Sequence, residues 1–235
     1  AVLGVFTLPA ILDGESPVAV AVVSSAAILF VVLYLAHGIS LRTSSALLGT
    51  LSSLVLAGVL SWLAIRTMHL TGLSGDQTTN LQVYQGSISI SGLLLAGFII
   101  GTLGVLNDVT ITQASAVWQL HEVDQGMTWR ALYERGMAVG RDHIASTVYT
   151  IVFAYAGAAL PLLLLFELYN QPWDVVLTSS ALAEEVIRTL VGSIALVLAV
   201  PVTTAVGAFF AKAAGTSAGE ATERRMTALR ARFAR

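Results

Sequence analysis

Six runs of apolar residues alternate with short polar segments along the 235-residue chain. A transmembrane helix needs about 20 consecutive apolar residues, whereas the strands of a membrane barrel alternate over about 10. The runs are continuous, so the pattern predicts an all-α fold, a polytopic transmembrane helix bundle of about six helices. The expected segments are 1–12, 17–36, 44–65, 88–106 with a helical continuation toward residue 120, 144–166 and 185–210.

The first run is too short to cross a bilayer by itself. The chain begins at Ala1, inside apolar sequence, and no basic region precedes the run as it would in a signal peptide. We therefore expect this first helix to be truncated and further N-terminal residues to be missing.

Composition supports the membrane assignment and excludes several kinds of chemistry. Hydrophobic residues make up 56% of the chain and charged residues 11%, with a mean hydropathy of +0.80. Soluble domains carry about 25% charged residues. The net charge of −2 gives no basic excess for nucleic acid, and the absence of cysteine excludes thiolate chemistry. The four histidines have no paired spacing, so we expect no metal, no cofactor and no enzyme activity.

Basic residues predict the orientation. Only Arg66 and Arg188 fall on the side opposite the C-terminal tail. By the positive-inside rule, the tail and both ends of this chain lie in the cytoplasm. The excess of Arg over Lys and the high Ala and Val content suggest a bacterial genome, so we expect the bundle in a bacterial plasma membrane. The ten basic residues of the tail side are Arg42, Arg130, Arg135, Arg141, Lys212, Arg224, Arg225, Arg230, Arg232 and Arg235.

This orientation divides the chain into two parts. Residues 1–211 form the transmembrane bundle, which includes a polar loop at 67–86 and a charged cytoplasmic linker at 121–141. Residues 212–235 form a polar cytoplasmic tail, which is either a surface helix or disordered.

Small and polar residues recur on single faces of the predicted helices. On the fourth helix they follow at spacings of three and four, which places them on one face. Small residues let helices approach closely in lipid, so helix packing is the simplest reading of the glycines. The face of the fourth helix is Gly97, Gly101, Gly104, Asp108, Thr112, Ser115 and Gln119. Other expected packing residues are Gly49, Ser53, Ala57, Gly157 and Gly192.

Asp108 stands out because it interrupts an apolar helix, beside Asn107 and one turn before Thr112. A carboxylate at the bilayer centre costs roughly 2.5–3.5 kcal/mol on the insertion scale, so such groups usually face a partner or a water-filled path. The pattern favours a proton or ion relay. Under the alternative, Asp108 lies at the cytoplasmic interface, where it is capped or hydrated.

Three consecutive polar residues, Arg141, Asp142 and His143, begin the fifth helix on the same side as Asp108. They could complete an ion-pair or proton-relay cluster, since histidine changes charge near neutral pH. In the simpler interpretation, Asp142 caps the helix and His143 is solvated.

Glu185 and Arg188 lie three residues apart near the start of the sixth helix, where they can form an ion pair on the outer side. Snorkelling of both side chains toward water explains them equally well.

Several strings resemble the YibE/F family of bacterial multi-pass membrane proteins, from the first residues to about residue 211. They are GTLGVLNDVT (101–110), QASAVW (113–118), GRDHIAST (140–147), AYAGAALPLLLLF (154–166) and EVIRTLVGS (185–193). Many relatives carry Asp-Asp where this chain has Asn107 and Asp108, so the resemblance leaves Asp108 as the sole acid of that pair. It also implies a soluble region before the membrane part.

A more distant, fold-level similarity is to one six-helix half of the RND superfamily, particularly SecF. It rests on the order of the polar helix features. Such halves occur in pairs, so this similarity implies a homodimer or another cyclic oligomer, and it implies membrane acids that work with protons.

Two functions follow from these features. The first is a proton-coupled transporter or exporter component, in which Asp108 loads and releases a proton. The alternative is a non-transporting scaffold or regulatory subunit of a larger membrane complex. A channel ranks lowest, because the outer half of the fourth helix offers only glycines for a polar path. The expected partners are membrane lipids and a second copy of the chain or another membrane subunit.

Overall fold

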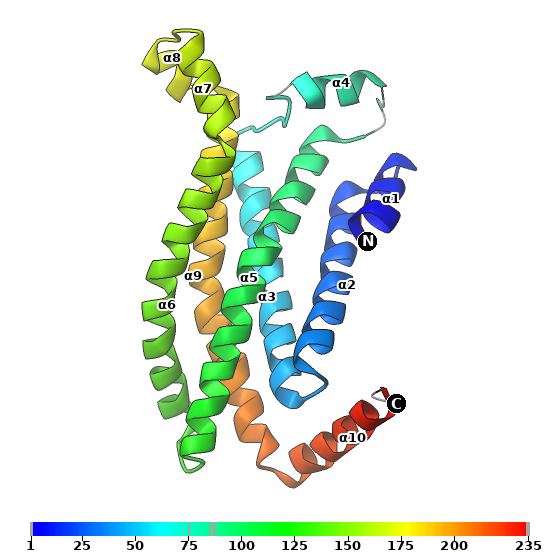
Figure 1. Cartoon of the computed structure of the whole chain (residues 1–235), viewed down its shortest axis with the longest axis vertical. Coiled ribbons are helices and arrows are strands. Elements are labelled where there is room, and N and C mark those ends of the chain that lie inside the picture. The colour runs from blue at the N-terminus through cyan, green and yellow to red at the C-terminus, as the bar shows by residue number, and fades with distance from the viewer. Residues whose placement is uncertain (1, 75, 85, 87, 234–235) are drawn as a thin grey trace. The chain divides into compact units, whose positions relative to one another are not determined.

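The computed structural model describes residues 2–74, 76–84, 86 and 88–233, and within this range the chain is helical and has no strand (Figure 1). All six apolar runs are helical, which confirms the predicted fold class. The elements in chain order are the π-helical turn η1 (Leu3–Thr7), α1 (Leu8–Leu12), α2 (Pro17–His37), α3 (Leu41–Thr67), α4 (Asp76–Tyr84), α5 (Ile90–Val123), α6 (Trp129–Ala158), α7 (Leu160–Leu168), α8 (Trp173–Leu177), α9 (Ser180–Ala214) and α10 (Ser217–Phe233).

Four helices in the described part of the chain are long and apolar enough to cross a membrane: α2, α3, α5 and α9. The helices α6 and α7 add a fifth crossing if they form one bent span. The first run, Leu3–Leu12, is a short apolar helix. These helices fit a multi-pass membrane protein.

Proline accounts for the break between α6 and α7. The two helices meet at an angle of 47°, and Pro161 lies in the first turn of α7. Proline has no N–H to donate to the preceding turn, and its ring clashes with that turn's carbonyl. The predicted segment 144–166 is therefore two helices. Glycine ends α2 in a similar way, because Gly38 adopts a φ of +75° directly after His37.

The segment 121–141 is mostly helical. The helix α5 continues to Val123 and α6 begins at Trp129, so only residues 124–128 connect them. Val117 near the end of α5 and Leu132 near the start of α6 are fully buried. The helical turns on both sides of this connection therefore pack against the rest of unit 2. The polar loop at 67–86 contains α4, and the tail forms α10. Arg235, which contributed to the predicted orientation, lies outside the described residues.

The chain forms two compact units, and the long helices contribute to both. Unit 1 contains Ala1–Ser25, Ala57–Leu103 and Val148–Ile194. Unit 2 contains Ala26–Leu56, Gly104–Thr147 and Ala195–Arg235.

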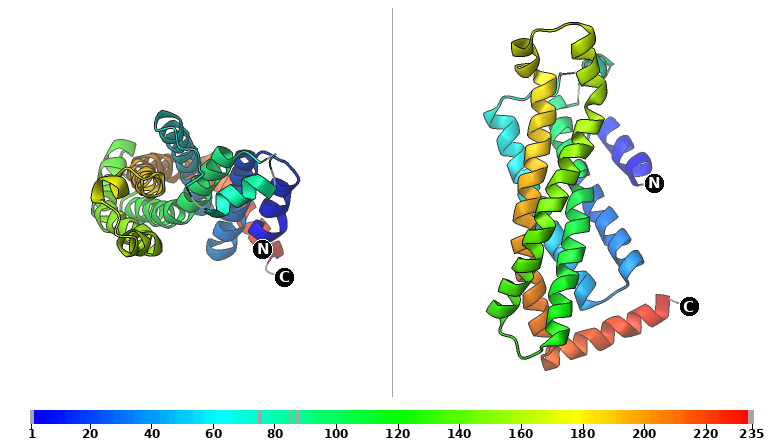
Figure 2. Two further views of the ribbon diagram at one scale, coloured as in Figure 1. Left: turned by 90° about the horizontal axis from the view of Figure 1, so that it is seen from above. Right: turned by 60° about the vertical axis from the view of Figure 1, so that its left-hand side comes forward.

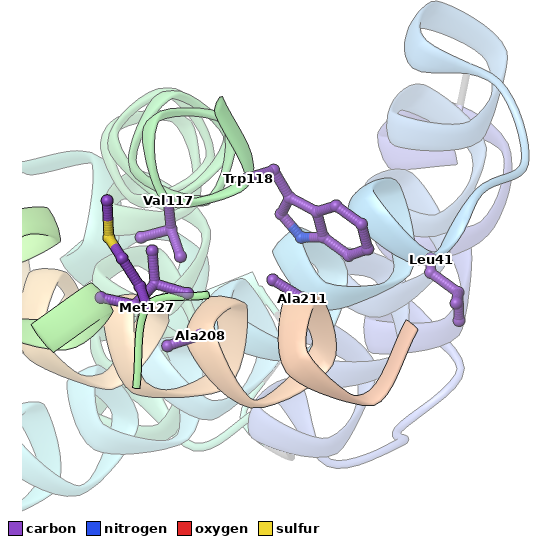
Figure 3. Packing of buried hydrophobic residues seen from close by; sticks show 7 residues of the cluster. Leu41, Val117, Trp118, Met127, Ala208 and Ala211 are labelled. Atoms are coloured by element: carbon purple, nitrogen blue, oxygen red, sulfur yellow. The ribbon is translucent and has the colours of Figure 1, made fainter. Parts of the chain in front are cut away.

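A hydrophobic cluster forms the core of unit 2 near the α5–α6 turn (Figure 3). Met226 of α10 packs against it, although α10 turns away from the axis of α9 (Figures 1 and 2). Amphipathic packing of this kind anchors an otherwise polar helix. The buried residues of the cluster are Leu41, Val117, Trp118, Met127, Leu132, Ala208 and Ala211.

Hydrogen bonds between side chains and neighbouring helices also hold unit 2 together. The Gln113 amide of α5 donates to the Gly136 carbonyl at 2.8 Å and to the Thr204 hydroxyl at 2.7 Å, which links α5 with α6 and α9. The Trp118 indole N–H donates to the Ser45 hydroxyl of α3 at 3.0 Å. Because a bilayer offers no water to polar groups, such pairs tie the helices together.

Glycine permits the close packing of unit 2. A Cβ atom added to Gly49 of α3 would lie 2.8 Å from the Thr203 Oγ1 atom of α9. The predicted face of α3 is buried throughout, at Gly49, Ser53 and Ala57. The absence of a side chain at Gly49 lets α3 and α9 approach each other.

Candidate functional site

Unit 1 contains a cavity of about 650 Å³ that combines apolar walls with charged side chains. It lies among the start of α9, the start of α5, α7 and the segment that follows α3. Its charged and hydroxyl-bearing residues are Ser74, Thr78, Glu184, Glu185 and Arg188, and its other residues are Gly72, Ile90, Leu93, Leu94, Gly97, Leu162 and Leu165.

Glu184 is the most deeply buried acid of this cavity, with 6% of its surface exposed. The Ser74 hydroxyl donates to its Oε2 atom at 2.6 Å. Its Oε1 atom is buried without a hydrogen-bond partner among the described residues. An unsatisfied buried carboxylate oxygen is costly, so this atom marks a place where a donor is missing.

Glu185 and Arg188 form the predicted ion pair. The Arg188 Nη1 atom donates to the Glu185 Oε1 atom at 2.7 Å, and the two side chains are 28% and 25% exposed. The Arg188 guanidinium also lies over the buried Phe98 ring, 5.2 Å from its centroid. Arg188 is thus held from two sides. Its positive charge is matched by Glu185, and Glu184 has no cation of its own.

A glycine turn places Ser74 at the cavity. Gly72 adopts a φ of +77°, and a Cβ atom there would lie 3.1 Å from the Ile90 carbonyl oxygen. Only glycine adopts this conformation at no steric cost. The turn brings Ser74 to Glu184, a residue 110 positions away in the chain.

Asp108 has a different environment, on the outward side of α5 in unit 2. Its side chain is exposed and forms no hydrogen bond or ion pair with another described residue. It is the only charged residue between Ile90 and Leu120. Thr112 is also exposed, and its hydroxyl donates to the Asp108 carbonyl at 2.9 Å. Asn107 is half-buried, and its Oδ1 atom has no partner within the described part of the chain.

The residues Arg141, Asp142 and His143 lie in the interior of α6, because this helix starts twelve residues earlier, at Trp129. Asp142 therefore does not cap a helix N-terminus. No ion pair among the described residues joins Arg141, Asp142 or His143 to Asp108. One chain thus does not assemble the expected relay cluster through direct contacts.

Four of the glycines expected to pack against other helices are exposed. A Cβ atom at Gly97, Gly104 or Gly157 would meet nothing within 4 Å, and one at Gly101 would meet only the Tyr155 hydroxyl, at 3.4 Å. Within the described residues, nothing lies close to Gly97, Gly104 or Gly157, and Gly97 borders the cavity. The role of these glycines in helix packing stays a prediction. Gly192 differs, since it is buried and a Cβ there would contact Thr102 at 3.6 Å.

The sequence pattern did not single out Glu184, Ser74 and Phe98 as site residues. Glu184 adjoins the predicted pair in sequence, so the double acid Glu184-Glu185 was the available signal. No sequence feature distinguished Ser74 as a site residue, because it is one of many polar residues in the loop at 67–86. Among the described residues, no three histidine, cysteine, aspartate or glutamate side chains lie together in a group that could hold a metal ion.

The chain matches a known protein family. The family model described as YibE/F-like protein matches residues 1–213. No curated protein and no solved structure matches the chain significantly. The fold-level similarity to SecF and RND halves therefore stays a prediction.

Proposed function

The chain belongs to the YibE/F-like family, and we propose that this membrane protein is a proton-coupled transporter or exporter component that works as a homo-oligomer, with Asp108 as the group that carries the proton. The observation behind this proposal is the position of Asp108. An exposed carboxylate on an otherwise apolar helix is incompatible with contact to lipid tails.

The surroundings of Asp108 favour a protein neighbour over lipid. Gly104 and Thr112, one turn away on either side, are exposed as well, which gives α5 a small and polar outward stripe. The helix α6 has a similar stripe, which includes Asp142, Ser146 and Gly157. Small residues of this kind allow close approach of a further helix. A second copy of the chain supplies one without any additional protein.

A carboxyl group enclosed in such an interface must be neutralised by a proton or a cation. Binding and release of a proton there would alternately remove and restore a charge at the interface. This is the physical basis for coupling proton movement to a change in how two copies pack.

A scaffold or regulatory subunit is the second candidate, and one observation favours it. Within the described residues, no hydrogen bond or ion pair connects Asp108 to Arg141, Asp142 or His143. A single chain thus shows no proton path at Asp108, and the same outward stripe could bind a different membrane protein.

Proton flux tests the proposal. Proteoliposomes with an imposed pH gradient and an internal pH dye should show flux for wild type and background for Asp108→Asn. The control is Asp13→Asn, which removes an exposed carboxylate in the turn after α1 and should keep wild-type flux. Flux in the folded Asp108→Asn protein equal to that of wild type would refute the role of Asp108.

Cross-linking in the same membranes separates the two candidates. The chain has no cysteine, so an introduced one is unique. Gly104→Cys should cross-link to a dimer under mild oxidation, whereas Val55→Cys, on an exposed face of α3, should stay monomeric. Absence of dimers, absence of flux and recovery of another membrane protein at fixed stoichiometry would favour the scaffold.

A further inference from the structure

The cavity of unit 1 is lined by two acidic residues, Glu184 and Glu185, and by one basic residue, Arg188. Arg188 pairs with Glu185, and the only hydrogen-bond partner that the described residues give Glu184 is the neutral hydroxyl of Ser74. We propose that this cavity binds a ligand with a primary ammonium group and an apolar body, and that the Glu184 carboxylate receives the ammonium group. This proposal rests on Glu184 and the cavity, and it does not depend on proton coupling at Asp108.

The unpartnered oxygen of Glu184 determines the headgroup. Glu184 lines the cavity, and its Oε1 atom is buried and accepts no hydrogen bond from a described residue. A ligand that fits must donate a hydrogen bond and bring a positive charge. A primary ammonium does both, because it carries three N–H donors. A quaternary ammonium carries the charge but has no hydrogen to donate.

The walls determine the rest of the ligand. Five of the lining residues have aliphatic side chains: Ile90, Leu93, Leu94, Leu162 and Leu165. The volume of about 650 Å³ lies in the range of about 300–1,000 Å³ that is typical of small-molecule sites. A hydrated metal ion would leave these walls uncovered, and calcium would need six to eight oxygen ligands.

Charge excludes an anionic ligand. Arg188 is already engaged by Glu185 and by the Phe98 ring. The other cation of unit 1, Arg66, stacks on Trp62 at 4.9 Å and does not line the cavity. Unit 1 contains two basic and seven acidic residues, which attract cations from solution.

Gly97 offers a way to block the cavity without disturbing the helix. It lines the cavity, and a Cβ atom there would meet nothing within 4 Å. A leucine at this position would therefore occupy space that the ligand needs while leaving the backbone in place.

Titration calorimetry on the full chain in lipid nanodiscs tests this site. The probe is 2-phenylethylamine, its trimethylated quaternary analogue is the chemical control, and empty nanodiscs report partition into lipid. We expect saturable binding to wild type and at least tenfold weaker binding of the quaternary analogue. Glu184→Gln should weaken binding of the amine at least tenfold and Ser74→Ala about threefold. Glu15→Gln, at an exposed position between α1 and α2, should leave it unchanged.

The proposal is overturned if wild type shows only the heat of empty nanodiscs, or if folded Glu184→Gln binds the amine as tightly as wild type. Either result would mean that Glu184 does not receive an ammonium group in this cavity. If Glu184→Gln does not fold, Gly97→Leu decides, since unchanged affinity in that variant also overturns the site. None of these readouts involves proton flux, so the result stands apart from the test of Asp108.

Discussion

The two units use polar residues in opposite ways. In unit 2, Gln113 and Trp118 find partners on neighbouring helices, and glycines at positions 49 and 140 allow tight contact. In unit 1, Glu184, Glu185 and Arg188 surround a cavity, and one carboxylate oxygen has no partner among the described residues. Polar groups in these helices thus either join neighbouring helices or border a cavity, and the space around them distinguishes the two arrangements.

The two units also differ in their numbers of basic and acidic residues. Unit 2 contains ten basic and seven acidic residues, whereas unit 1 contains two basic and seven acidic ones. Basic residues therefore exceed acidic ones in unit 2, where polar groups join helices, and acidic residues exceed basic ones in unit 1, which contains the cavity.

The largest expected effect tests the tight packing of unit 2. Gly140→Leu should destabilise the protein by about 3 kcal/mol, the upper end of ordinary overpacking. A Cβ atom there would clash with Val200 and lie 2.9 Å from the Gln113 Oε1 atom. Gly97→Leu is the matched control and should change stability by less than about 0.5 kcal/mol. Unfolding in mixed detergent micelles measures both, and equal losses would contradict the distinction between the units.

A smaller effect is expected from the hydrogen bonds of unit 2. Gln113→Leu removes the donations to Gly136 and Thr204, which should lower the free energy of unfolding by about 1–2 kcal/mol. Gln119→Leu, at an exposed position of the same helix, should have almost no effect. The same micelle assay applies, and a loss at position 119 as large as that at 113 would rule out the role assigned to Gln113.

The smallest expected effect compares two ion pairs. Glu185 and Arg188 are about three-quarters buried, whereas Arg130 and Glu134 are 86% and 63% exposed. Double-mutant cycles with glutamine should give a coupling of about 1 kcal/mol for the unit 1 pair and about 0.3–0.5 kcal/mol for the exposed pair. The coupling of the exposed pair should vanish in high salt, because water and ions screen it. Equal couplings would show that the cavity does not shield its ion pair from solvent.

One pattern in the sequence led to two structural outcomes. Small residues follow at helical spacing on α3 and on α5. On α3 they are buried, whereas on α5 Gly97, Gly104 and Asp108 are exposed. Periodicity states which residues share a face, and it contains no information about what that face contacts. Only the structure shows that a Cβ atom at Gly97, Gly104 or Gly157 would meet no described atom within 4 Å.

The sequence by itself determined the class of the protein, its six apolar helical runs and the family to which it belongs. Long uninterrupted apolar runs leave a chain no other way to satisfy its backbone in lipid, and Pro161 and Gly38 break or end helices through local sterics alone. Only the tertiary structure decided which polar groups meet. Ser74 and Glu184 are 110 residues apart and touch because a glycine turn and the start of α9 converge on one cavity. Asp108 and Glu184 are both acids in apolar helices, and their surroundings differ because one faces outward and the other is enclosed by neighbouring helices.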